Sequence, residues 1–158
     1  MPAIFKIFNK KIKFFLEEHQ IIYQEITHKP AASAEEYHQI LGTRYEQQAK
    51  ALLIRYKKPG VKGFVVVTVP AQKRANLEQI KNVLQAKSVR LAEPKQLQEI
   101  TGCNFGELPP LGKIFGLQLL MDQELLQEPK IYFNAGKLDL SIVLSPKDLQ
   151  KLEEPILL

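Results

Sequence analysis

Apolar and cationic side chains alternate with helical spacing over the first 19 residues of the chain. Lysines stand between apolar residues that recur every three or four positions, namely Ile4, Ile7, Phe8, Ile12, Phe15 and Leu16. This pattern predicts an amphipathic helix over residues 1–19 that packs its apolar side on the domain. A basic amphipathic helix can also lie on an anionic membrane surface. The acidic pair Glu17 and Glu18, and the strand predicted directly afterwards, favour packing on the domain.

After this helix, short apolar runs alternate with helical patterns to the end of the chain. Strands are predicted at residues 21–26, 49–56, 63–69, 88–91, 114–120, 130–133 and 138–144. Helices are predicted at residues 34–41, around 77–84, from 94 to about 100, and from 146 onwards. Ser33 and Glu36 form a capping-box pattern, and Gly42 follows that helix as a C-terminal stop. Ser145 and Pro146 are a typical start for the last helix.

These elements predict a mixed α/β fold. Strands and helices are interleaved without a strict strand–helix–strand repeat, so a mixed sheet is expected and not a doubly wound parallel one. The 158 residues suit one hydrophobic core, and no internal repeat or low-complexity segment divides them. We therefore expect a single compact domain over residues 1–158.

Composition limits the expected cellular compartment and the expected class of binding partner. No apolar run reaches the roughly 18 residues of a transmembrane helix, and the N-terminus does not resemble a signal peptide. A single cysteine, Cys103, excludes an internal disulfide and predicts a cytoplasmic protein. Residues 1–95 hold 17 Lys and Arg against 8 Asp and Glu, whereas residues 96–158 hold 5 against 9. A basic first half suits a polyanionic partner such as RNA, although it also suits an ordinary solvated surface.

The familiar catalytic patterns are absent from the sequence. Its histidines have no metal-binding spacing, and there is no Gly-x-Ser-x-Gly elbow or phosphate-binding loop. Cys103 is expected to be a buried structural residue and not a nucleophile. Lys50 is the most unusual position because it interrupts an apolar strand, where it faces either a cleft or the solvent.

Residues 101–112 form a loop with three glycines and two prolines. This composition cannot continue a helix or a central strand. Glycine allows close approach of another backbone or a ligand, and proline makes the loop rigid. The loop is therefore either an ordinary turn cluster or a frame of backbone groups for a small polar ligand.

Five segments resemble, in the same order, the motifs of the YbaK/ProX family, whose editing domains hydrolyse mischarged tRNA. In the loop, Gly106, Pro110 and Gly112 match a Gly, three residues and Pro-x-Gly, and Thr101-Gly102 matches the upstream pair. The other matching segments are His28-Lys29-Pro30, Ala49-Lys50-Ala51-Leu52-Leu53, Tyr132-Phe133-Asn134-Ala135-Gly136 and Leu144-Ser145-Pro146-Lys147-Asp148-Leu149. Together they extend from about residue 28 to residue 149.

The resemblance implies a curved mixed sheet surrounded by helices, and a catalytic site that uses no cofactor, metal or nucleophilic side chain. It implicates Lys50 in holding the aminoacyl-tRNA end, through the phosphate of the terminal adenosine or the ester carbonyl. Backbone amides near Gly106 and Gly112 would stabilise the oxyanion of the ester. The substrate-binding residues implied by the motifs are His28, Gly102, Pro110, Asn134 and Gly136.

The function implied is that of a free-standing trans-editing aminoacyl-tRNA deacylase. Its expected substrate is tRNA(Pro) carrying a small wrong amino acid such as Cys or Ala, with an aminoacyl-tRNA synthetase as a candidate partner. Two alternatives remain open: a non-catalytic tRNA-binding or synthetase-associated module of the same fold, and a small-molecule binding protein. Many relatives have small residues at the positions of Glu107 and Leu108. The larger side chains here could narrow the pocket or reverse its local charge.

Overall fold

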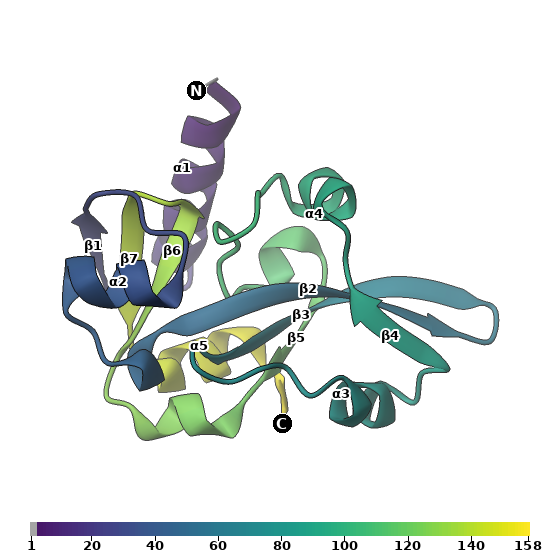
Figure 1. Cartoon of the computed structure of the whole chain (residues 1–158). Helices are drawn as coiled ribbons and strands as arrows, with labels where there is room; N and C mark the ends of the chain where they lie inside the picture. Colours follow the sequence, from purple (N-terminus) through teal and green to yellow (C-terminus); the bar gives the residue numbers. More distant parts are fainter. Residues whose placement is uncertain (1–2) are drawn as a thin grey trace.

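The computed structural model describes the backbone of residues 3–158 and the side chains from Lys10 onwards (Figure 1). Its α-helices are α1 (Ala3–Glu18), α2 (Ala34–Leu41), α3 (Leu77–Leu84), α4 (Pro94–Thr101) and α5 (Pro146–Glu153). Short 3-10 helices are η1 (Tyr45–Gln47), η2 (Lys113–Phe115) and η3 (Gln123–Gln127). The strands are β1 (Tyr23–Thr27), β2 (Ala49–Lys58), β3 (Val61–Pro70), β4 (Ser88–Leu91), β5 (Gln118–Met121), β6 (Ile131–Lys137), β7 (Leu140–Leu144) and β8 (Ile156–Leu157).

The strands form two sheets, where a single curved sheet was expected. The smaller sheet is antiparallel with the order β1-β7-β6, and the larger has the order β4-β2-β3-β5-β8. In the larger sheet β3 runs parallel to β5 and β5 parallel to β8, whereas β2 is antiparallel to both of its neighbours. The predicted mixed α/β class is therefore confirmed. A bridge between Gln48 and Tyr132 joins the start of β2 to β6 where the two sheets meet.

Helices cover both faces of the larger sheet, with α3 on one side of β2 and α4 on the other (Figure 1). Ile54 packs with Ile80 and Leu84 of α3, whereas Leu53 belongs to the same cluster as Leu97 of α4. Successive side chains of a strand point to opposite faces, so β2 separates two apolar layers. The layer on the α4 side continues to the smaller sheet and α1.

Helix α1 packs against β6, as its amphipathic pattern predicted. Ile12 and Leu16 are fully buried in the larger core cluster. Lys10 and Lys11 face solvent on the same helix. The predicted apolar positions Ile4, Ile7 and Phe8 lie outside the described side chains.

The predicted helix ends are confirmed, and several strand limits are corrected. Ser33 and Glu36 form the capping box of α2, Gly42 ends that helix in a left-handed conformation, and Ser145 caps α5. The strand predicted at 114–120 is wrong in its first half, because residues 113–115 form η2 and Gly116 ends it at φ 71°. The strand predicted at 130–133 continues to Lys137 through a bulge, which an alternating pattern cannot reveal.

Candidate active site

A pocket opens where the start of β2 meets β6, the segment before α2 and the glycine–proline loop. It encloses about 510 Å³, part of it open to solvent. Its walls carry small side chains, since Ala31, Ala32, Ala34, Ala49, Ala51 and Ala71 line it. The other lining residues are Ser33, Tyr37, Gln48, Lys50, Gly106, Leu108, Tyr132, Phe133 and Asn134. We call this site the alanine pocket.

Lys50 lies at the edge of the alanine pocket, one residue into β2. Its Nζ donates to the carbonyl oxygens of Lys73 at 2.8 Å and Ala71 at 3.4 Å, in the turn that follows β3. Partial burial, followed by repulsion from Arg74, lowers the pKa of Lys50 below its ordinary value. No carboxylate pairs with this ammonium in the described part of the chain. The cation is therefore available to an anionic or polarised ligand in the pocket.

Gly106 and Asn134 shape the opposite wall. Gly106 has φ +87°, and a Cβ there would lie 3.2 Å from the carbonyl oxygen of Ala32. The Asn134 amide donates to the carbonyl oxygens of Ala31 at 2.9 Å and Gly106 at 3.0 Å. One buried side chain thus joins the segment before α2 to the glycine–proline loop. The Gly106 N–H has no acceptor among the described residues, so it can donate to a ligand.

The neighbouring residue Glu107 does not line the alanine pocket, so its side chain neither narrows the pocket nor places a charge on its wall. Its carboxylate accepts from the backbone N–H of Asn104 at 2.7 Å, and its carbonyl oxygen accepts from Gly136 N–H at 2.9 Å. Burial raises the pKa of Glu107, and the Asn104 hydrogen bond partly offsets the shift. Leu108, in contrast, does line the pocket. Gly136 supports the loop from the β6 bulge and is not a lining residue.

His28 belongs to a hydrogen-bonded group behind the alanine pocket and does not line it. Its Nε2 lies 2.6 Å from Ser141 Oγ, and its Nδ1 lies 2.7 Å from the carbonyl oxygen of Lys29. The Tyr37 hydroxyl donates to the same Ser141 oxygen at 2.5 Å, and Ser141 contacts Asn134 Oδ1 at 3.3 Å. Sequence reasoning missed Tyr37 and Ser141. The one usable signal was a serine within the otherwise apolar strand β7.

Gly112, Gly102 and Pro110, which were predicted as site residues, do not line the alanine pocket. The Gly112 N–H donates to Glu153 Oε1 at 2.9 Å, and a Cβ there would lie 2.5 Å from the carbonyl oxygen of Leu117. Gly112 is thus needed for close backbone packing, and its N–H is already occupied. Gly102 is the exposed left-handed C-cap of α4, whose N–H donates to Gln98. Pro110 is buried in the loop.

Cys103 is buried, as expected, and is not placed to attack a substrate. Its side chain is 0% exposed, and burial raises the pKa of its thiol to about 12. The thiolate, which is the reactive form, is therefore negligible near neutral pH. The described residues also contain no group of three or more His, Cys, Asp or Glu side chains that could hold a metal ion.

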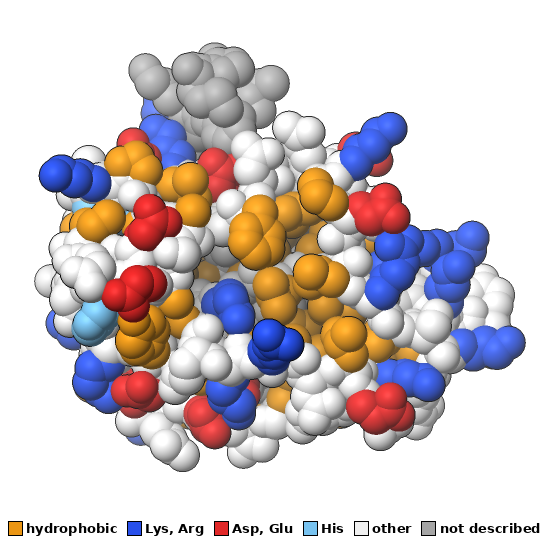
Figure 2. Space-filling model, in the orientation of Figure 1, with side chains coloured by type: hydrophobic (Ala, Val, Ile, Leu, Met, Phe, Trp, Pro, Cys, Tyr) orange, Lys and Arg blue, Asp and Glu red, His pale blue; other side chains and the backbone are white. Residues whose placement is uncertain are grey.

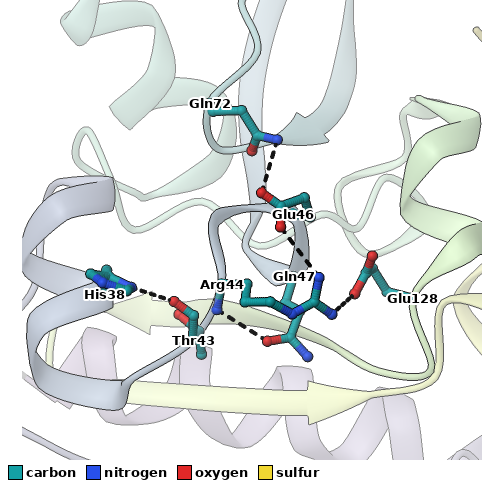
Figure 3. Close-up of polar contacts among 7 residues, drawn as sticks. All are labelled: His38, Thr43, Arg44, Glu46, Gln47, Gln72 and Glu128. Carbon is teal, nitrogen blue, oxygen red and sulfur yellow. Dashed lines mark hydrogen bonds and ion pairs between the residues drawn. The ribbon is translucent and has the colours of Figure 1, made fainter.

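A polar frame fixes the short segment that leads into β2 (Figure 3). Arg44 forms ion pairs with Glu46 of η1 and Glu128 beyond η3, while the Gln72 amide donates to Glu46 at 3.4 Å. His38 Nδ1 contacts the carbonyl oxygen of Thr43 at 2.6 Å. These contacts hold η1 against the turn that receives Lys50.

Gln48, at the end of this segment, was also missed from the sequence. Its amide donates to Thr43 Oγ1 at 3.1 Å and to the carbonyl oxygen of Ala34 at 3.3 Å. It therefore connects the entrance of β2 to the start of α2 while it lines the alanine pocket. Nothing in the local pattern distinguishes Gln48 from an exposed glutamine, because its partners lie elsewhere in the chain.

Sequence comparison finds a tRNA deacylase and a tRNA ligase among the relatives of this chain. The chain is 34% identical over 134 residues to the Multifunctional Ser/Thr-tRNA deacylase ProXp-y of Escherichia coli (strain K12), covering 84% of this chain and 80% of that protein. It is 31% identical over 101 residues to a proline–tRNA ligase of Thermosipho melanesiensis, of which the match covers 17%.

Solved structures show the same fold. The hypothetical protein APE2540 superimposes with a TM-score of 0.84 at 23% identity, covering 93% of this chain and 96% of that one. A candidate trans-editing enzyme for prolyl tRNA synthetase superimposes with a TM-score of 0.79 at 24% identity, covering 95% and 94%. No described helix is long and apolar enough to cross a membrane. Residues 28–152, which include the whole alanine pocket, match the model of the aminoacyl-tRNA editing domain, and the chain belongs to that family.

Proposed function

We propose that this protein is a trans-editing aminoacyl-tRNA deacylase that removes a small amino acid from a wrongly charged tRNA. The observation that carries the proposal is the convergence of the Lys50 ammonium, the free Gly106 N–H and the Asn134 clamp on a pocket lined by alanines. Such a pocket suits the ester between a small amino acid and the terminal ribose. Membership of the editing family and the name of the Escherichia coli relative support the same reaction.

In this mechanism, Lys50 binds the charged end of the RNA or polarises the ester carbonyl. Charge develops on the carbonyl oxygen as the ester is attacked, and preorganised donors stabilise that charge best. The Gly106 N–H supplies one such donor. Asn134 acts through Gly106, because its amide fixes the position of the loop and is itself fully used by two carbonyl oxygens.

The nucleophile is water or a hydroxyl of the substrate. Three lining residues carry a side-chain hydroxyl, and two of these hydroxyls, those of Ser33 and Tyr37, are already committed to protein partners; the third belongs to Tyr132. Ser33 Oγ contacts Glu36 Oε1 at 3.1 Å within the capping box, and the Tyr37 hydroxyl donates to Ser141. Burial raises the pKa of Tyr37 well above its usual value, which makes its phenolate unavailable as a base.

The size of the pocket gives the specificity a physical basis. A synthetase pocket excludes a smaller amino acid poorly, since one methylene is worth only about 1–3 kcal/mol. A second pocket that accepts the smaller amino acid and rejects the larger one restores fidelity, and we assign that role to the alanine pocket. Cys or Ala on tRNA(Pro) are candidate substrates from the sequence. Ser and Thr join them because the Escherichia coli relative is named for those two amino acids.

The test is hydrolysis of Ser-, Thr-, Cys- and Ala-tRNA, each prepared with tRNA(Pro) and with its cognate tRNA. We expect wild type to release one or two of these amino acids and Lys50→Ala to release none while remaining folded. Lys151→Ala, which removes an exposed lysine of α5, should behave as wild type. Full activity of Lys50→Ala would refute the role of Lys50. Binding of tRNA without release of any amino acid would favour the non-catalytic module.

A further inference from the structure

The far end of the larger sheet carries a cluster of cations on one face. Arg55 and Lys57 are two residues apart on β2, so their side chains share a face. Arg55 pairs directly with Arg90 of β4, and Lys57 pairs directly with Lys62 of β3. We call Arg55, Lys57, Lys62 and Arg90 the basic face. Figure 2 shows Lys and Arg side chains gathered over this end of the molecule.

This arrangement has an energetic cost. Like charges directly opposite each other on neighbouring strands destabilise a sheet. Arg55, Lys57 and Lys62 have no ion pair within the described residues, and Arg90 reaches only Glu93 at 3.2 Å. Repulsion from Arg55 and then Lys62 lowers the pKa of Lys57. Two direct like-charge pairs with so little compensation leave this face with a positive charge that an anionic partner would offset.

The same face of β2 leads from the basic face to the alanine pocket. Ala51 and Leu53 precede Arg55 at alternate positions on β2, so all of these side chains point to the α4 side. Ala51 and Leu53 line an apolar hollow together with Leu97, Phe105 and other residues. The hollow shares Ala51, Gly106 and Leu108 with the alanine pocket. At about 3.3 Å per residue, Arg55 and Lys57 lie roughly 13 and 20 Å along the strand from Ala51.

We propose that the basic face binds the phosphate backbone of the RNA whose aminoacylated 3′ end occupies the alanine pocket. This inference rests on the proposed function and adds the place where the RNA body is held. A polynucleotide fits because it presents successive negative charges over the same distance as the strand. Lysines and arginines that contact phosphates fix the position of a nucleic acid without reading its sequence. The basic face therefore contributes affinity for RNA and not selection of the amino acid.

The test compares two triple variants that remove the same charge. Arg55→Gln, Lys57→Gln and Lys62→Gln together neutralise the basic face and leave the Arg90–Glu93 pair intact. Lys11→Gln, Lys147→Gln and Lys151→Gln neutralise three exposed lysines on α1 and α5. Each protein is assayed with aminoacyl-tRNA, with aminoacyl-adenosine that lacks the RNA body, and for binding of uncharged tRNA over a range of salt concentrations.

For the basic-face variant we expect KM for aminoacyl-tRNA to rise about tenfold or more with kcat retained, because phosphate contacts are lost. The slope of log Kd for uncharged tRNA against log salt should fall by about 2–3, with three phosphates released. Hydrolysis of aminoacyl-adenosine should be unchanged. The melting temperature should not fall, because the removed charges repel one another. The control variant should match wild type in every assay.

Equal KM values and salt slopes for wild type and the basic-face variant would overturn the inference while leaving the deacylase intact. Equal losses on aminoacyl-tRNA and aminoacyl-adenosine would also overturn it, since the effect would then lie in the alanine pocket. Absence of hydrolysis by wild type on every substrate would instead refute the proposed function. In that event the salt dependence of tRNA binding still tests the basic face alone.

Discussion

The side-chain amide of Asn134 donates to the carbonyl oxygen of Gly106 at 3.0 Å and thereby joins β6 to a loop 28 residues earlier in the chain. The same amide reaches Ala31 at 2.9 Å, so one side chain holds two walls of the alanine pocket. Asn134 is 9% exposed, and its carboxamide oxygen contacts Ser141. The shape of the pocket therefore depends on a residue with no free donor for the substrate.

Replacing Asn134 with Ala should reduce both stability and activity. Two carbonyl oxygens would lose their donor, and leaving buried polar groups unpaired costs about 1–3 kcal/mol. We expect a lower free energy of unfolding in urea titrations and a drop in kcat/KM for aminoacyl-tRNA. Asn82→Ala on the exposed side of α3 is the control and should change neither. An Asn134→Ala protein with wild-type stability and deacylation rate would show that Asn134 is not needed to hold the two pocket walls together.

Comparing Gly106→Ala with Gly60→Ala separates the effect of backbone strain on stability from the effect of a changed pocket shape on activity. Both glycines have positive φ, +87° and +74°, which costs a residue with a Cβ about 1–2 kcal/mol. A Cβ at Gly60 meets nothing within 4 Å, whereas one at Gly106 presses on Ala32 in the pocket wall. Both variants should melt at a lower temperature, but only Gly106→Ala should lose deacylation. Equal activity in the two variants would show that the pocket tolerates the displacement.

Glu153 should make stability depend on pH. Burial raises the pKa of Glu153. The hydrogen bonds from Gly112 and Lys113, and the nearby charges of Lys113 and His19, oppose this shift without cancelling it. Between the unfolded and folded pKa values the folded protein holds a proton that the unfolded chain releases. The contribution of Glu153 is therefore most favourable in acid and is lost as pH rises through the folded pKa.

Glu153→Gln tests this sign, because the amide stays neutral and its Oε1 can still accept from Gly112 and Lys113. The difference in unfolding free energy between the variant and wild type should favour the variant more strongly near neutral pH than at about pH 4. Unfolding free energies at several pH values measure the difference. Glu154→Gln, at the exposed neighbouring position, should show little such trend. Glu153→Ala should cost about 1–3 kcal/mol in acid, since two N–H groups lose their acceptor, and the cost should become smaller as pH rises.

Cys103 should be inert in the folded protein. With its thiol buried and its pKa raised to about 12, a thiol reagent should react slowly at about pH 8 and rapidly once the chain is unfolded. Cys103→Ala should retain deacylation, because the thiol does not line the alanine pocket. Rapid labelling of the native protein, or a folded Cys103→Ala variant without activity, would instead support Cys103 as a nucleophile.

Local features of the sequence were enough to locate most elements. The capping box of Ser33 and Glu36, the stop at Gly42 and the start at Ser145 were predicted because their hydrogen bonds join residues within a single turn. The strand predicted at 114–120 failed because its apolar residues continue across Gly116, where the chain turns. Apolar content reports burial, which a 3-10 turn and a strand can share.

The candidate site was predicted only in part. Lys50, Gly106 and Asn134 were chosen through the family resemblance, and all three line the alanine pocket. Gly112 was chosen through the same motif, yet its N–H is bound to Glu153, 41 residues later. Tyr37, Gln48 and Ser141 were missed because the partners that give them a role come from other elements.

The sequence alone determined the mixed α/β class, the helix ends, the buried state of Cys103 and the family, because each depends on local pattern or on ordered motifs. The tertiary structure decided that the strands form two sheets, and that their meeting point encloses the alanine pocket. It also decided which of Gly106 and Gly112 keeps an N–H without an acceptor among the described residues, and which cations of β2, β3 and β4 share one face of the larger sheet. These properties arise from contacts between distant segments, and no local pattern encodes which segments will meet.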